Sequence, residues 1–294
     1  MKRTLAAAVV LSAALALGTV APAQAAFLPS GGQTLYGLTT TNRIVTFTTG
    51  FSVLATNSVA VSGLAAGEQL IGIDRRPRTG ELYGVGKSGS AGRLYTINPA
   101  TGVASFVAGL VAAPTAAAPR GGPVALSGTE FGFDFNPMAD ALRITSDTGQ
   151  NLRVIPSDRT PATGPALMTG DTFTDGVLNA DVTPATGVTA AAYTNNVSGA
   201  TSTVLFDLDT RRDLLVEQRP PNAGTLVTIG SLRFPVGSVA GFDIVTAGGT
   251  DTAYAAVTVG VLPFTLLVRV DLGTGRTTIS GLAAFPETLR GLAA

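Results

Sequence analysis

Residues 131–136 read Phe-Gly-Phe-Asp-Phe-Asn, and their aromatic side chains alternate with small and polar ones in the two-residue period of a β-strand. A small or polar residue two positions before an aspartate recurs three more times, at Ile71-Gly72-Ile73-Asp74, Asn179-Ala180-Asp181 and Gly241-Phe242-Asp243. Each copy opens a unit of about 40–60 residues made of short predicted strands and turns, which is typical of a β-propeller. A glycine at this position allows close backbone approach, as the innermost strand of a blade requires.

Two further predicted strands follow each opening strand. The second strands carry Tyr83, Tyr193 and Tyr254, whereas the copy that opens at residue 131 has Arg143 at this position. The third strands span residues 94–97, 152–155, 205–208 and 267–270. No segment shows a sustained helical period, so the sequence predicts an all-β fold.

The first copy lacks an opening strand, and the C-terminus supplies a candidate for it. This copy begins directly with its second and third strands, residues 35–37 and 44–47. The tail Leu289-Arg290-Gly291-Leu292 resembles residues 70–73, Leu-Ile-Gly-Ile. We therefore predict a β-propeller of about five blades, closed into a ring by the C-terminal strand. A sixth blade is the alternative, if residues 157–190 contain a degenerate copy.

The first 25 residues have the pattern of a secretory signal peptide. Lys2 and Arg3 form a charged start, residues 5–20 are apolar, and Ala23-Gln24-Ala25 fits a cleavage site. We expect residues 1–25 to be removed and residues 26–294 to form one propeller domain, periplasmic or secreted. No later stretch is long and apolar enough to span a bilayer, so we expect no membrane insertion after cleavage.

The composition excludes several kinds of chemistry. The chain has no His and no Cys, which rules out Ser-His-Asp and Cys-His nucleophiles, disulfides and the common zinc sites. Without Lys2 and Arg3, 17 of the 19 basic residues remain against 19 acidic ones, so no nucleic-acid partner is expected. Oxygen chemistry remains, through paired carboxylates or a hard cation such as calcium.

The aspartates of the opening strands are the candidate metal ligands. If these strands line the central channel, Asp74, Asp134 and Asp243 lie close together, and a calcium ion would offset their charge. Asp181 belongs to the most divergent copy, and the closing strand brings no aspartate. The alternative is that each aspartate accepts hydrogen bonds from backbone N–H groups at the following turn. No other cofactor is predicted.

The copy with Arg143 differs most from its siblings and is the candidate ligand site. Arg143 and Arg153 stand where other copies have aromatic residues, and arginine suits recognition of carboxylate or phosphate groups. The predicted ligand-binding residues are Asp134, Asn136, Arg143, Asp147, Asn151 and Arg153. The alternative is a structural ion pair of Arg143 with Asp134 or Asp147.

Three stretches of the chain resemble a bacterial family catalogued as domain of unknown function 4394. They are residues 132–153, which begin Gly-Phe-Asp-Phe-Asn-Pro, residues 188–195, and Pro220-Pro221-Asn222-Ala223-Gly224-Thr225-Leu226. The resemblance spans residues 33–285. It implies a secreted or periplasmic bacterial repeat protein and implies no activity.

These observations favour an exported binding or structural module over an enzyme. The expected ligand is a small molecule, a glycan or a protein. The alternative is a carboxylate- or calcium-dependent hydrolase of the glycosidase type on the same scaffold. Such a hydrolase needs two acids within about 5–10 Å of each other that reach the substrate.

Overall fold

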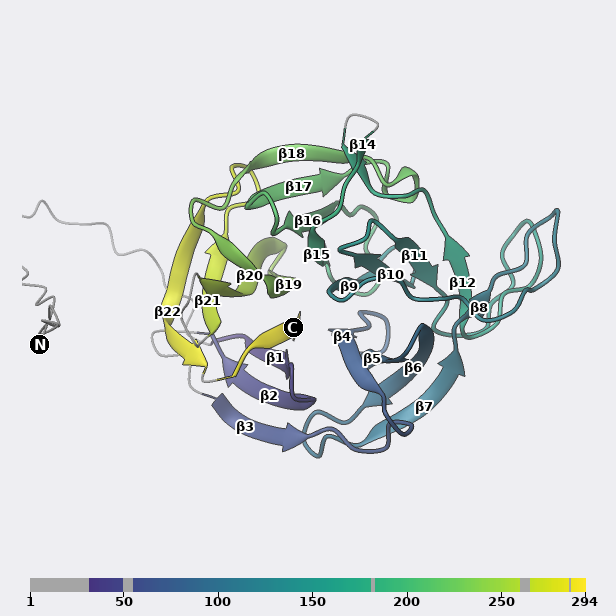
Figure 1. Ribbon diagram of the computed structural model, residues 1–294, viewed down its shortest axis with the longest axis horizontal. Coiled ribbons are helices and arrows are strands. Elements are labelled where there is room, and N and C mark those ends of the chain that lie inside the picture. The colour runs from purple at the N-terminus through teal and green to yellow at the C-terminus, as the bar shows by residue number, and fades with distance from the viewer. Residues whose placement is uncertain (1–31, 50–54, 181–182, 260–264, 286) are drawn as a thin grey trace, which may run out of the picture. The chain divides into compact units, whose positions relative to one another are not determined.

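Five sheets follow one another along the chain, and each forms one blade of a β-propeller (Figure 1). The computed structural model describes residues 32–49, 55–180, 183–259, 265–285 and 287–294, with the backbone alone for residues 281–285. The predicted signal segment, residues 1–25, and Asp181 lie outside the described residues. The prediction of an all-β propeller is confirmed.

Blades 1, 2, 4 and 5 each contain four antiparallel strands. From the innermost strand outward, blade 1 contains β23 (Leu289–Ala293), β1 (Thr34–Thr39), β2 (Arg43–Thr48) and β3 (Ala55–Ala60). In the same order, blade 2 contains β4 (Gln69–Arg75), β5 (Leu82–Ser88), β6 (Ala91–Ile97) and β7 (Ala104–Gly109). Blade 4 contains β15 (Val188–Tyr193), β16 (Leu205–Asp209), β17 (Leu214–Gln218) and β18 (Leu226–Ser231). Blade 5 contains β19 (Val236–Ala247), β20 (Thr250–Val259), β21 (Thr265–Val270) and β22 (Thr277–Phe285).

Blade 3 has a fifth, parallel strand at its outer edge. It contains β9 (Phe131–Asn136), β10 (Ala141–Ser146), β11 (Asn151–Val154), β12 (Asp171–Thr174) and β8 (Val111–Ala112). The short strands β13 (Asn179–Ala180) and β14 (Thr183–Pro184) form a separate ribbon, and η1 (Pro221–Ala223) is a 3-10 turn. Residues 157–190 thus give β12 to blade 3 and the start of β15 to blade 4, so the six-blade alternative is wrong.

The C-terminal strand closes the ring, as the repeat pattern predicted. β23 pairs antiparallel with β1, with Ala293 opposite Tyr36 and Gly291 opposite Leu38. The innermost strands contact one another in the order β4, β9, β15, β19, β23 and back to β4. Figure 1 shows the C-terminus at the centre of this ring. Closure covers the inner edge of β1 and makes β23 the innermost strand, as β4, β9, β15 and β19 are in the other blades.

The prediction for the fourth repeat is wrong, because the segment predicted as its second strand is the innermost strand of blade 4. Its innermost strand is β15, which carries Ala190-Ala191-Ala192, whereas Asn179 and Ala180 belong to the small ribbon. Tyr193 is therefore an inner-strand residue, and Phe206 of β16, opposite Ala192, takes the second-strand position. The error arose because Asn179-Ala180-Asp181 repeats the motif, whereas β15 has neither its glycine nor its aspartate.

Apolar side chains are buried mainly between neighbouring blades. Phe133 and Phe135 of blade 3 pack with Ile71 and Tyr83 of blade 2, and Leu292 of β23 packs with Val245 of blade 5. The glycine of the motif is needed for this packing, because a Cβ on Gly72 would lie 2.5 Å from Phe133 Cβ. The predicted close approach of the inner strands is confirmed.

Candidate functional site

Three buried carboxylates from three blades meet among the inner strands. One oxygen from each of Asp74, Asp134 and Asp243 lies within 4.8 Å of the others, and all three residues are 0% exposed. They occupy equivalent positions, since they pair with Tyr83, Arg143 and Tyr254 on their second strands. Ala192 and Ala293 hold this position in blades 4 and 1. The structure thus brings together the three residues predicted as metal ligands.

Backbone N–H groups hold part of this cluster. Asp74 Oδ2 accepts from Phe135 N–H at 2.7 Å, and Asp134 Oδ2 accepts from Tyr193 N–H at 3.1 Å, so both bonds run to the next blade. Asp74 and Asp243 each also accept from the N–H of the following residue at 2.6 Å. The sequence also allowed the alternative that these aspartates accept hydrogen bonds from backbone N–H groups. Some of the carboxylate oxygens do so.

The remaining oxygens of the cluster lack partners. Asp134 Oδ1 and Asp243 Oδ2 have no hydrogen bond of good geometry to any described residue. Burial, and then the charges of Asp74 and Asp243, raise the pKa of Asp134 well above its usual range. Burial raises the pKa of Asp243 to about 7, against the lowering effect of the N–H groups of Ile244 and Ala294. The cluster therefore favours a proton or a cation over three free charges.

Arg143 is enclosed by protein groups. Its residue is 1% exposed, and Nη1 donates to Asn151 Oδ1 and to Asp175 Oδ2 at 2.7 Å each. Nη2 donates to Asn222 Oδ1 at 2.8 Å, and Nε to the Tyr193 hydroxyl at 3.3 Å. These contacts join blade 3 to blade 4, which is the arrangement expected of a structural ion pair. The acid of the pair is Asp175, not Asp134 or Asp147.

The other predicted ligand-binding residues do not form one site. Arg153 shares Asp175 with Arg143, at 2.8 Å from Nε, and its guanidinium lies over the Phe173 ring. Asn136 caps the β9–β10 turn through the N–H groups of residues 138 and 139. Asp147 accepts from the Thr129 N–H at 3.0 Å and its hydroxyl at 2.6 Å. The structure therefore brings Arg143, Asn151 and Arg153 together around Asp175 and places Asp134 and Asn136 beside Tyr193, which Arg143 also contacts, whereas Asp147 lies at the Thr129 turn.

Asp207 of β16 is a buried carboxyl that the sequence did not single out as a site. It is 0% exposed, and neither oxygen has a hydrogen bond to a described residue. Burial raises its pKa to about 8, while Arg143 lowers it and Asp209 raises it further. Strand alternation alone does not reveal such a group, because Asp207 and Asp209 alternate with Phe206 and Leu208 as polar residues of a half-exposed strand would, yet both are buried.

A groove of about 620 Å³ lies between blades 1 and 2. Tyr36 of β1 lines it from blade 1, and the strands of blade 2 with the turns after β4 and β6 line it from the other blade. The polar and aromatic side chains that line it include Tyr36, Arg75, Glu81, Thr96, Asn98 and Ser105. Arg75 is held by its Nε, which donates to the Gly80 carbonyl at 3.1 Å. The sequence did not predict this groove.

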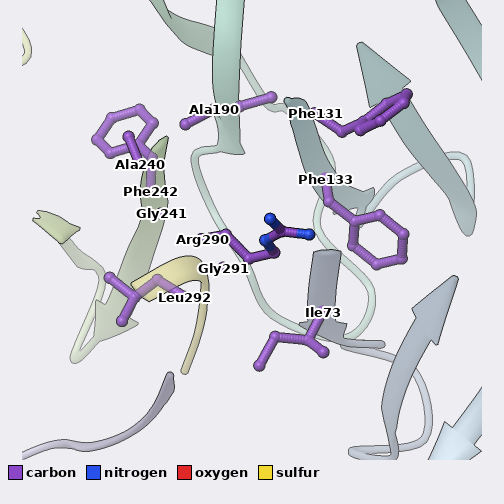
Figure 2. A pocket seen from close by; sticks show the side chains of 11 residues that line it. Ile73, Phe131, Phe133, Ala190, Ala240, Gly241, Phe242, Arg290, Gly291 and Leu292 are labelled. Carbon is purple, nitrogen blue, oxygen red and sulfur yellow. The ribbon is translucent and has the colours of Figure 1, made fainter. Parts of the chain in front are cut away.

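A small cavity of about 10 Å³ lies among the inner strands, with room for about one water molecule. Figure 2 shows Arg290 in this cavity, with Phe133 and Ile73 near its side chain. Arg290 Nε is buried and has no hydrogen-bond partner among the described residues, and Nη1 lies 3.5 Å from the Leu70 carbonyl. The cavity is too small for an organic ligand.

No helix among the described residues is long and apolar enough to cross a membrane.

The model of a family described as "Domain of unknown function (DUF4394)" matches residues 43–293. Comparison with curated proteins finds no match. A functionally unknown protein from Desulfotomaculum acetoxidans is similar in structure, with 13% identity, 88% of this chain and 83% of that chain covered, and a TM-score of 0.39.

Two further solved structures are similar at lower TM-scores. A putative 6-phosphogluconolactonase from Bacteroides fragilis has 14% identity, with 88% and 69% of the two chains covered and a TM-score of 0.30. A quinonprotein alcohol dehydrogenase-like protein from Bacteroides thetaiotaomicron has 13% identity, with 90% and 67% covered and a TM-score of 0.30. These likenesses give no information on what this chain binds.

Proposed function

The chain belongs to the DUF4394 family, a domain of unknown function, and we propose that it is an exported β-propeller that binds a small polyhydroxy ligand such as a sugar or a glycan end. The observation that carries this proposal is the groove between blades 1 and 2. Its volume of about 620 Å³ falls in the range of small-molecule sites, about 300–1,000 Å³.

The side chains of the groove suit a neutral ligand with many hydroxyl groups. Thr96, Thr101 and Ser105 offer hydroxyls that both donate and accept hydrogen bonds. Arg75 and Glu81 add a donor and an acceptor of opposite charge, which suits vicinal hydroxyls better than a net anion or cation. Tyr36 contributes an aromatic surface for the apolar face of a sugar ring.

The groove is better suited to binding a glycan than to hydrolysing one. The three carboxylates that converge at the inner strands are 0% exposed, so they do not reach a glycan in the groove. Glu81 is the one carboxylate among the described residues that line the groove. A glycosidase needs two acids at the scissile bond, and the groove offers one.

Export is the second part of the proposal and rests on the sequence of residues 1–25. Mass spectrometry of the protein recovered outside the cytoplasm is expected to give a chain that starts at Ala26. A chain that retains the apolar residues 5–20 would contradict it.

Isothermal titration calorimetry with neutral, acidic and amino monosaccharides and with short oligosaccharides tests the binding. We expect saturable binding to at least one of them, weakened at least about tenfold, or 1.4 kcal/mol, by Glu81→Gln. Tyr36→Ala should also weaken it. Phe106→Ala is the control, since Phe106 is 61% exposed on β7 and does not line the groove. Binding that is equal in all variants, or absent with every sugar, would contradict the proposal.

A further inference from the structure

We infer that the inner strands form a binding site for one divalent cation of the calcium type, held by Asp74, Asp134 and Asp243. The site is separate from the groove and does not depend on the proposed function. It would link blades 2, 3 and 5 through one ion, because each blade contributes one carboxylate. Three observations carry the inference.

The first observation is the spacing of the carboxylates. One oxygen of each residue lies within 4.8 Å of the others. Calcium binds oxygens at about 2.3–2.6 Å, so two ligands on opposite sides of the ion are about 4.6–5.2 Å apart. Pairs of these oxygens at separations up to 4.8 Å can therefore be ligands of one calcium ion. Magnesium demands near-ideal octahedral geometry at about 2.0–2.1 Å and gives up its water reluctantly, so a buried set of carboxylates suits calcium better.

The second observation is that oxygens of this cluster are buried without partners. Asp134 Oδ1 and Asp243 Oδ2 accept no hydrogen bond of good geometry from a backbone or side-chain donor of the described residues, and both residues are 0% exposed. Asp134 also lies within hydrogen-bonding reach of the Asp74 carboxyl. Two ionised carboxylates at that distance repel each other unless a positive species lies between them. Backbone N–H groups hold the other oxygens in place, as in a preformed ligand set.

The third observation is a small cavity among the same inner strands. Ile73, Phe133 and Phe242 line it together with Arg290 and directly precede the three aspartates in sequence, which are not among its lining residues. Its volume of about 10 Å³ admits about one water molecule. Calcium takes six to eight oxygen ligands, so water and backbone carbonyls would have to complete the shell that three carboxylates begin.

Calcium-dependent melting of the full mature chain tests the inference. Protein treated with chelator and then dialysed against calcium should retain about one calcium ion per chain by elemental analysis. Calcium at about 100 times Kd should raise Tm by roughly 5–10 °C, because an ion that binds only the folded state stabilises it. Magnesium at the same concentration should raise it less, and an equal rise with magnesium would overturn the calcium-type assignment.

Matched variants locate the site. Asp134→Asn and Asp243→Asn should abolish the calcium-dependent rise in Tm, whereas Asp271→Asn, at an exposed turn, should keep it. If Asp134→Asn and Asp243→Asn fail to fold, terbium luminescence excited through tyrosine in the wild-type chain tests whether the chain binds an ion of the calcium type. Calcium should displace the bound terbium. Identical melting with chelator and calcium, or a rise in Tm that survives both inner substitutions, would overturn the inference.

Discussion

The N–H of Phe135 on β9 donates a 2.7 Å hydrogen bond to Asp74 Oδ2 on β4, so the buried acid of blade 2 is bonded to the inner strand of blade 3. Asp134 makes the same kind of bond to the Tyr193 N–H of blade 4. Such bonds require the inner strands to approach closely, and the small residues of the repeat motif permit this.

Substitution Gly72→Ala tests that close approach. The added Cβ would meet Phe133 Cβ at 2.5 Å, so we expect the free energy of unfolding to fall by about 1–3 kcal/mol. Gly109→Ala on β7 of the same blade is the control, because a Cβ there meets nothing within 4 Å. Urea unfolding of both variants is the measurement. Equal stability of the two would show that the inner strands are further apart than described.

Arg143→Met tests whether Arg143 holds blades 3 and 4 together. The substitution leaves Asn151 and Asn222 without their buried donor and Asp175 with Arg153 alone, so we expect a loss of about 3–5 kcal/mol. Arg153→Met should cost less, because the Arg153 side chain is 25% exposed. Adding Asp175→Asn to Arg143→Met should recover part of the loss. Wild-type stability of Arg143→Met in urea would argue against a structural role.

Asp207→Asn should stabilise the protein in a pH-dependent way. The pKa of Asp207 is raised from 3.8 to about 8 by burial, so below about pH 4 the carboxyl is neutral in both folded and unfolded chains. As pH rises from about 4 to about 8, the unfolded chain releases the proton and the folded chain keeps it, so the wild type loses stability. The gain from Asp207→Asn should therefore grow across this window and level off above about pH 8.

Urea unfolding near pH 4 and near pH 8 measures this gain, with Asp271→Asn as an exposed control. A gain of the same size at both pH values would mean that Asp207 carries no shifted pKa.

The local sequence motif predicted the inner strand correctly in each repeat that retains the motif. Gly72, Gly132 and Gly241, each two residues before an aspartate, correctly marked β4, β9 and β19, and the resemblance of the tail to residues 70–73 correctly predicted β23. The repeat pattern also predicted that the aspartates of β4, β9 and β19 lie close together, because equivalent positions of the inner strands lie at the same height along the axis of a propeller.

Contacts between blades and turns could not be predicted in the same way. The pairing of Arg143 with Asp175 and Asn222 joins residues 32 and 79 positions away, which strand alternation does not relate. The groove depends on how the turns after β4 and β6 stand against blade 1, and turn composition does not fix that placement. Asn222 lies in the Pro-Pro-Asn stretch of the family resemblance, but its contact was not predicted.

Ring closure by the C-terminal strand is the central claim, because Tyr36 of the groove pairs with β23 and Ala294 lies beside Asp243. The most direct measurement is the Tm of a chain that ends at residue 286. It lacks Leu289 and Leu292, which are 0% and 2% exposed and together contribute about 3–6 kcal/mol by burial. We predict a fall in Tm of more than about 10 °C relative to the chain that ends at Ala294. Equal melting temperatures of the two chains would contradict closure.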